Sequence, residues 1–261
     1  MSIRLHTLTV SAGAEAARAF LVPGNDLCAE FYRPLAEELA GRGLTTTLAT
    51  LPGFNGLPGW SPPRVEAYVE EIRRGAREAM SSDGVLLGHS LGGLFAFLAL
   101  AGEPTLARRL LLLEPFILPS RRLARGAART YRAQVVEGQG DAFRNWTGSF
   151  RRVHDLERFP AWAIELYLEV RRTTAPGTVA ALMDQLEGLY PLPFAQVQAP
   201  VRILRGARSG WRNRLMHSAL RFTFGRATVR AVPGLAHWMA NEDDPTLAEA
   251  IVAFALEGVT T

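Results

Sequence analysis

The sequence contains no lysine, so all 29 of its basic residues are arginines. This absence excludes catalysis through a lysine Schiff base and the phosphate-binding loop G-x-x-x-x-G-K-[ST], which requires a lysine. Cysteine is nearly absent as well, because Cys28 is the only one among 261 residues. The chain therefore has no internal disulfide bond or cysteine-based metal cluster, and we expect neither a metal ion nor a cofactor.

Long apolar runs are also missing, since no uninterrupted stretch reaches the ~18 residues that span a membrane. The N-terminus, Met1-Ser2-Ile3-Arg4-Leu5-His6, lacks the charged-then-apolar order of a signal peptide. We therefore expect a cytoplasmic protein with no stable membrane insertion. Hydrophobic residues make up 48% of the chain and charged residues 21%, which is typical of a globular protein with a large core.

The formal net charge is +4, and the arginines are scattered along the chain. We therefore expect no nucleic-acid partner. A denser set occurs at Arg121, Arg122, Arg125, Arg129 and Arg132, and this spacing places several of them on one helix face. Such a face is usually solvated; the alternative is attraction to anionic substrates or membrane surfaces.

Apolar runs alternate with helical patterns along most of the chain, which is typical of an α/β domain with a parallel sheet. Residues 3–10 and 17–22 are expected to form a strand pair, and further strands are expected at 44–50, 84–88, 110–113, 200–205 and 227–232. Helical patterns occupy 28–41, 64–80 and 245–256. The alternation stops at 116–195, where tryptophan, tyrosine and arginine occur in helical patterns. We therefore expect a core made of 1–115 and 196–261, with a helical cap inserted at 116–195.

The segment Gly88-His89-Ser90-Leu91-Gly92-Gly93 lies between two apolar runs, 85–87 and 94–100. This context predicts a strand, a tight turn and a buried helix, and it matches the G-x-S-x-G nucleophile elbow. The glycines let strand and helix approach closely, while the strained turn exposes the Ser90 hydroxyl. The helix N-terminus then points the Leu91 N–H at any oxyanion formed there. The alternative is a glycine-rich turn before a buried helix.

A histidine loop, Pro233-Gly234-Leu235-Ala236-His237-Trp238-Met239, lies between the last predicted strand and the last predicted helix. Together with the elbow, this loop resembles the α/β-hydrolase superfamily. The resemblance implies a mostly parallel central sheet flanked by helices, with His237 as the base that takes the proton of Ser90. The alternative is a histidine that only caps or packs.

The acid of the triad departs from the commonest pattern of that superfamily. Most relatives carry an aspartate shortly after the strand that ends here at Gly206, but residues 206–211 contain no carboxylate. Glu114 ends the apolar run 110–113, and Leu113–Pro119 resembles the haloalkane dehalogenases, which take their acid from this position. The resemblance implies that Glu114 orients His237.

Other roles for these carboxylates stay open. Glu114 could instead cap a neighbouring helix or pair with an arginine of the cap. Glu242, Asp243 and Asp244 follow His237 closely, but they are more typical of the positive end of the last helix.

The second donor of an oxyanion hole is expected in Val22-Pro23-Gly24-Asn25, which resembles the family's His-Gly-x element with Pro23 in place of the histidine. The match implies that the backbone N–H of Asn25 joins that of Leu91 at the oxyanion. The alternative is that Asn25 only initiates a turn.

A serine nucleophile suits acyl transfer, whereas dehalogenases of this type use an aspartate. We expect a carboxylesterase-like serine hydrolase that uses Ser90, His237 and Glu114 on a small-molecule ester with a small or medium apolar acyl group. The alternatives are a thioesterase, a lactonase or a carbon–carbon bond hydrolase on the same triad, or a non-catalytic binding protein of the same fold. The chain is expected to be a monomer or a homodimer.

Overall fold

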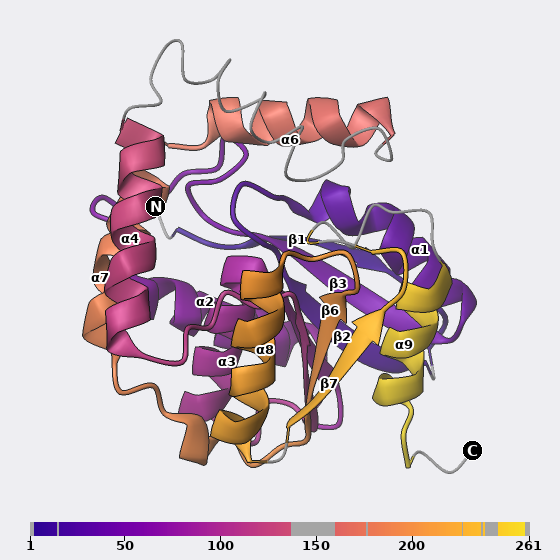
Figure 1. The fold of residues 1–261 in the computed structure, drawn as a ribbon. Coiled ribbons are helices and arrows are strands. Elements are labelled where there is room, and N and C mark those ends of the chain that lie inside the picture. Colours follow the sequence, from indigo (N-terminus) through magenta and orange to yellow (C-terminus); the bar gives the residue numbers. More distant parts are fainter. Residues whose placement is uncertain are drawn as a thin grey trace.

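A seven-stranded sheet with the order β1-β3-β2-β4-β5-β6-β7 forms the centre of the computed structural model (Figure 1). The structure describes residues 3–14, 16–136, 160–175, 177–225, 227–235, 237 and 245–258. The strands are β1 (His6–Val10), β2 (Ala17–Val22), β3 (Leu44–Thr50), β4 (Val85–His89), β5 (Arg109–Leu113), β6 (Val201–Gly206) and β7 (Ala227–Val232). β1 is antiparallel to β3 and all other neighbours are parallel, so the mostly parallel sheet is confirmed.

The predicted pairing of the first two strands is wrong, because β3 lies between β1 and β2. All seven residues of β3 are buried, although four of them are threonines. Their hydroxyl groups find partners there, as Thr47 shares a hydrogen bond of 2.9 Å with Thr9, and Thr45 accepts one of 2.9 Å from the Ala12 N–H. Buried hydroxyls that are hydrogen-bonded in this way allow a threonine-rich strand to lie inside the sheet.

Helices cover both faces of the sheet (Figure 1). The apolar core on one face includes α2 (Val65–Ala79), α3 (Ser90–Gly102) and α8 (Trp211–Phe224). The core on the other face includes the short helix η1 (Ala29–Tyr32), α1 (Arg33–Gly41) and α9 (Pro245–Ala255). α3 is apolar on every side, so it is buried on every side, as a helix of that composition must be.

Between residues 116 and 195, the regular elements in the described part of the chain are all helical. They are α4 (Arg121–Val136), α6 (Ala161–Thr173), α7 (Thr178–Gln185), η3 (Leu186–Leu189) and the start of η4 (Phe194–Gln196). α6 lies across the top of the view in Figure 1, while α4 and α7 run down one side. Residues 137–159 of the predicted cap lie outside the described residues.

The arginine-rich face of the sequence lies on α4. Arg121 donates to Glu187 at 3.1 Å, and Arg125 is also paired with Glu187. Arg122 is exposed to solvent. One carboxylate thus neutralises part of this face, and solvent covers another part.

The parallel strands place their carboxyl ends along one edge of the sheet. Among the described residues, the non-glycine residues with positive φ are Asp26 (56°), Asn55 (51°), Ser90 (51°) and Glu114 (43°). They follow β2, β3, β4 and β5 respectively, all at this edge. Left-handed backbone is strained for such residues, and strain of this kind clusters at functional sites. The candidate site therefore lies at this edge.

None of the helices in the described ranges is both long and apolar enough to cross a membrane.

Candidate active site

The predicted nucleophile elbow corresponds to the turn where β4 ends at His89 and α3 begins at Ser90, whose φ is 51°. A methyl group added to Gly88 would lie 2.6 Å from the carbonyl oxygen of Gly92. One added to Gly92 would lie 2.1 Å from the carbonyl oxygen of Pro23, at the end of the neighbouring strand. Both contacts are far too short for a Cβ atom, so this turn requires glycine at both positions.

The loop after β2 packs directly against the elbow. A methyl group added to Gly24 would lie 3.3 Å from Ser90 Cβ and 2.9 Å from His89 Nδ1. The segment expected to hold the second oxyanion donor, Gly24–Asn25, is therefore adjacent to the serine. Leu91 follows the serine in the first turn of α3, where backbone N–H groups have no partner within the helix. Both expected donors thus belong to segments that border Ser90.

Asp26 fixes this loop to α6. Its carboxylate accepts hydrogen bonds from Asn25 Nδ2 at 2.9 Å and from Arg171 at 2.6 Å. Asp26 is only 2% exposed, and its burial raises the pKa of the carboxyl group, an effect that the charge and hydrogen bond of Arg171 oppose. A buried carboxylate needs such a partner. The ion pair therefore ties α6 to the loop beside the elbow.

Glu114 ends β5 with a buried carboxylate that accepts several hydrogen bonds. Oε1 accepts from the Gly206 N–H at 2.7 Å and from Ser209 Oγ at 2.6 Å. Oε2 accepts from Asn213 Nδ2 at 3.3 Å and lies 3.5 Å from His237 Nδ1. The segment after β6, which lacks an acid, thus supplies donors to the acid from β5.

The surroundings of Glu114 keep it ionised. Burial by itself would raise the pKa of its carboxyl group, but the hydrogen bond with His237, the charges of His217 and His237, and the Ser209 hydroxyl lower it to about 2. Glu114 is therefore a carboxylate at neutral pH, in position to accept the Nδ1 proton of His237. None of the described arginines pairs with it, so the alternative of an arginine partner finds no support.

A buried hydrogen-bonded chain holds the histidine loop against the elbow. His89 Nε2 lies 2.8 Å from the carbonyl oxygen of His237, and Tyr32 Oη lies 2.7 Å from His89 Nδ1. The Gly24 N–H donates to Tyr32 Oη at 3.1 Å. These hydrogen bonds link the loop after β2, the elbow and the histidine loop. The ring centres of His89 and His237 are 5.1 Å apart.

These contacts determine the tautomer of His89. A carbonyl oxygen only accepts, so His89 Nε2 must donate to His237, and Nδ1 must then accept from the Tyr32 hydroxyl. Burial, and then the neighbouring charge of His237, lower the pKa of His89 to about 3. His89 is therefore neutral at neutral pH and acts as a fixed connector between the two loops.

Replacing Tyr32 with phenylalanine tests this connector. The variant leaves His89 Nδ1 and the Gly24 N–H without their partner. We therefore expect kcat for the ester hydrolysis expected from the sequence to fall about tenfold. KM should change little, because Tyr32 would orient the site and not bind substrate. Tyr68→Phe is the matched control. Tyr68 lies on α2, and its buried hydroxyl donates to the Pro52 carbonyl oxygen at 2.8 Å. Both variants should lower the melting temperature, but equal effects on kcat would contradict the connector.

The other histidines of the sequence have different places. His217 is fully buried on α8, where Nε2 donates to the Pro115 carbonyl oxygen at 3.2 Å and Nδ1 lies 4.0 Å from Glu114 Oε1. His6 lies on β1, the outermost strand on one side of the sheet. His154 lies outside the described residues, as do the alternative acids Glu242, Asp243 and Asp244.

Sequence reasoning missed the residues that support the expected site. They are Tyr32, His89, Ser209, Asn213 and His217. Each acts through a contact with a residue far away in the sequence, so local pattern gives no signal for it. The sequence offers one signal for Ser209, which is the missing carboxylate after Gly206. An acid supplied by another strand needs hydrogen-bond donors, and this segment lies beside it.

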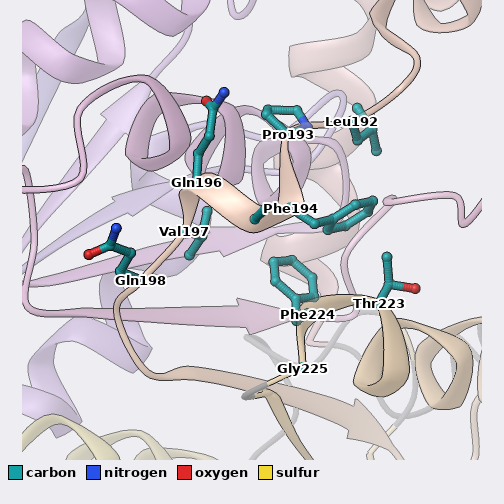
Figure 2. A pocket seen from close by; sticks show the side chains of 10 residues that line it. Leu192, Pro193, Phe194, Gln196, Val197, Gln198, Thr223, Phe224 and Gly225 are labelled. Atoms are coloured by element: carbon teal, nitrogen blue, oxygen red, sulfur yellow. The ribbon is translucent and has the colours of Figure 1, made fainter.

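Two cavities are lined by described residues, and Ser90 lines neither of them. A groove of about 830 Å³ is lined by residues 192–198 and 223–225 (Figure 2). These residues precede β6 and β7, so the groove lies at the amino ends of the strands, and Ser90 lies at the carboxyl ends. A small apolar cavity of about 10 Å³ is lined by Leu94, Phe116, Leu118, Ala124, Leu186, Leu189, Tyr190 and Leu192. Within the described ranges, no group of three or more histidine, cysteine or acidic residues could hold a metal ion.

Solved structures of similar fold include MenH from S. aureus, with a TM-score of 0.78 and 15% identity over 98% of this chain and 99% of that one. A carboxylesterase of the thaumarchaeon Nitrososphaera gargenis has a TM-score of 0.73 and 12% identity over 96% and 93% of the two chains. The thioesterase domain from the curacin biosynthetic pathway has a TM-score of 0.67 and 15% identity over 97% and 94%. These identities establish the fold alone.

Among curated proteins, no sequence matches this chain. The model of the alpha/beta hydrolase family matches residues 19–250, which include the elbow, Glu114 and the histidine loop. The chain therefore belongs to the alpha/beta hydrolase family.

Proposed function

We propose that this protein is a serine hydrolase that cleaves carboxylic esters through an acyl-enzyme. The observation that carries this proposal is the buried Glu114 carboxylate, which lies 3.5 Å from His237 Nδ1, together with the positive φ of Ser90 in the elbow. In this proposal the nucleophile, the base and the acid come from three separate segments, which follow β4, β7 and β5 at the carboxyl ends of the strands. This is the arrangement that activates a serine hydroxyl.

The reaction assigns a role to each group. Ser90 Oγ attacks the ester carbonyl carbon while His237 takes its proton, and Glu114 stabilises the resulting imidazolium. The backbone N–H groups of Asn25 and Leu91 bind the oxyanion of the tetrahedral intermediate, where one such donor is worth about 3 kcal/mol of barrier. His237 then protonates the leaving alcohol, and a water molecule, deprotonated by the same histidine, hydrolyses the acyl-enzyme.

Residues 116–195 act in this proposal as a cap over the core formed by 1–115 and 196–261. Support comes from the ion pair between Arg171 and Asp26, and from the Ala175 N–H, which donates to the Gly53 carbonyl oxygen at 2.8 Å. These contacts attach the end of α6 to the loops after β2 and β3. α6 therefore borders the edge of the sheet where the ester would bind.

The proposal includes a short apolar acyl group, because two residues near Ser90 line a small apolar cavity. Leu94 lies one turn beyond Ser90 on α3, and the Phe116 N–H donates to the Ser90 carbonyl oxygen at 2.8 Å. Both residues line the apolar cavity of about 10 Å³, which is room for about one water-sized group. Without rearrangement of its walls, this cavity holds no more than a methyl-sized part of an acyl group.

A substrate panel tests the proposed reaction. We expect kcat/KM for p-nitrophenyl acetate and propionate to exceed the value for the octanoate at least about tenfold, because the cavity is small. Acetyl-CoA and a simple lactone serve as comparisons. Faster turnover of the thioester or the lactone would replace the carboxylesterase assignment, and no turnover of any compound by folded protein would favour the binding protein.

A further inference from the structure

α8 carries an apolar pair on the side that faces away from the core. His217, Leu220 and Phe224 point inward and are at most 7% exposed. On the outer side Leu215 is 67% exposed and Phe222 is 83% exposed. Single exposed apolar residues are ordinary, but these two lie seven residues apart and so share one stripe of the helix. The stripe presents two large apolar side chains to solvent.

Arginines accompany both members of the pair. Arg214 precedes Leu215, and Arg221 precedes Phe222, so the arginines also lie seven residues apart on the exposed stripe. No carboxylate among the described residues forms an ion pair with either of them. The exposed stripe of α8 is therefore both apolar and positively charged.

The described surroundings of α8 offer little negative charge to the exposed stripe. Residues 188–241 hold eight of the 29 arginines and none of the 25 acidic residues of the chain. α8 packs against β6, β7 and η4, all of which lie in this segment. Among the described residues, Glu114 reaches α8 from outside the segment, but it is 1% exposed and held in the candidate site.

The groove of Figure 2, at the end of α8, is separate from this stripe. Its lining contains no charged side chain, so it cannot offset the arginines. The ring of Phe224 packs against Phe194 with centres 4.9 Å apart and against Phe97 at 5.3 Å. Phe224 therefore belongs to the core, while Phe222 has no such role.

We propose that the outer stripe of α8, defined by Arg214, Leu215, Ser218, Arg221 and Phe222, docks onto an anionic phospholipid surface. The two apolar side chains enter the boundary between head groups and acyl chains, and the guanidinium groups bind lipid phosphates. Charge complementarity favours this occupant, because a second copy of the chain would bring arginine against arginine. Protruding side chains also suit a fluid surface. The proposal does not depend on ester hydrolysis.

Flotation with lipid vesicles tests the proposal on the full chain. We expect binding to vesicles made of equal parts phosphatidylglycerol and phosphatidylcholine, weakened by salt, and no binding to pure phosphatidylcholine. The double variant Arg214→Gln/Arg221→Gln should bind the anionic vesicles roughly 25-fold more weakly. Leu215→Ser/Phe222→Ser should lose at least about tenfold.

The control variant is Arg122→Gln/Leu123→Ser, which removes an exposed arginine and a leucine that is 52% exposed from α4. It should bind like the unmodified chain, and melting temperatures should show that all variants are folded. Absence of vesicle binding would overturn the proposal, as would equal losses in the α4 and α8 variants. Binding to poly-L-glutamate but not to the vesicles would overturn it in favour of an acidic protein partner.

Discussion

Replacing Ser90 with alanine should abolish ester hydrolysis, lowering kcat for p-nitrophenyl acetate by about 10⁴-fold to 10⁶-fold. The reason is that no other group takes over the covalent step when the hydroxyl is removed. Ser81→Ala is the matched control, since Ser81 is exposed and precedes β4 rather than following it. Activity in Ser90→Ala within tenfold of the unmodified enzyme would contradict the assignment of Ser90 as nucleophile.

A second variant at this position separates folding from chemistry. Ser90 has a φ of 51°, which strains any residue except glycine. Ser90→Gly should therefore be as inactive as Ser90→Ala but more stable towards unfolding than Ser90→Ala by about 1 kcal/mol. Thermal or denaturant unfolding measures this difference. Equal stabilities would mean that the elbow is not strained at the nucleophile.

Replacing Glu114 with glutamine should have the second largest effect, lowering kcat about 10³-fold to 10⁴-fold. Glutamine keeps the shape of the side chain and can still accept the hydrogen bonds of Gly206 and Ser209. It removes the charge opposite His237 Nδ1 and permits a donor to face that nitrogen, which favours the wrong histidine tautomer. The loss should therefore appear in kcat with little change in KM.

The matched control for this variant is Glu71→Gln on α2. Glu71 is a partly buried carboxylate that, like Glu114, accepts more than one hydrogen bond, from Arg74 at 2.6 Å and from the Leu5 N–H at 3.3 Å. The Glu71→Gln variant should keep full activity. A fall of only a few-fold in folded Glu114→Gln would mean that the acid comes from elsewhere, or that the site does not use a triad.

The pH dependence of these variants follows from the pKa of Glu114. Its value of about 2 lies below the ordinary value of 4.5, so ionisation of this carboxyl group favours folding at pH values above 4.5. That contribution, about 3 kcal/mol, is lost as the pH falls from 4.5 through 2. Glu114→Gln should therefore lose less stability than the unmodified chain across this interval, which acid unfolding curves would measure.

The elbow and the histidine loop could be predicted because each is a local pattern. Gly88 and Gly92 are required by contacts within and beside one turn, and the family model includes this region. The position of β1 could not be predicted, because its partner β3 is not its neighbour in the sequence and strand pairing depends on the whole sheet. The first two strands were correctly located but wrongly paired.

The residues that donate hydrogen bonds to Glu114 could not be predicted either, because they are distant from it in the sequence. Ser209 and Asn213 donate to Glu114 across separations of 95 and 99 residues, and Tyr32 reaches His89 across 57. Nothing local in the sequence indicates that these side chains share a site. Sequence reasoning could name Glu114, because it ends an apolar strand, but only the fold shows which donors stabilise its charge.

Reaction with a fluorophosphonate probe, followed by peptide mass spectrometry, tests whether His237 and Glu114 activate Ser90, because the probe reacts with serines that a neighbouring base has activated. We expect one adduct, on Ser90, which His237→Ala abolishes and Glu114→Gln strongly reduces. An adduct on another residue, labelling that persists in folded His237→Ala, or no adduct in folded unmodified protein would contradict this expectation.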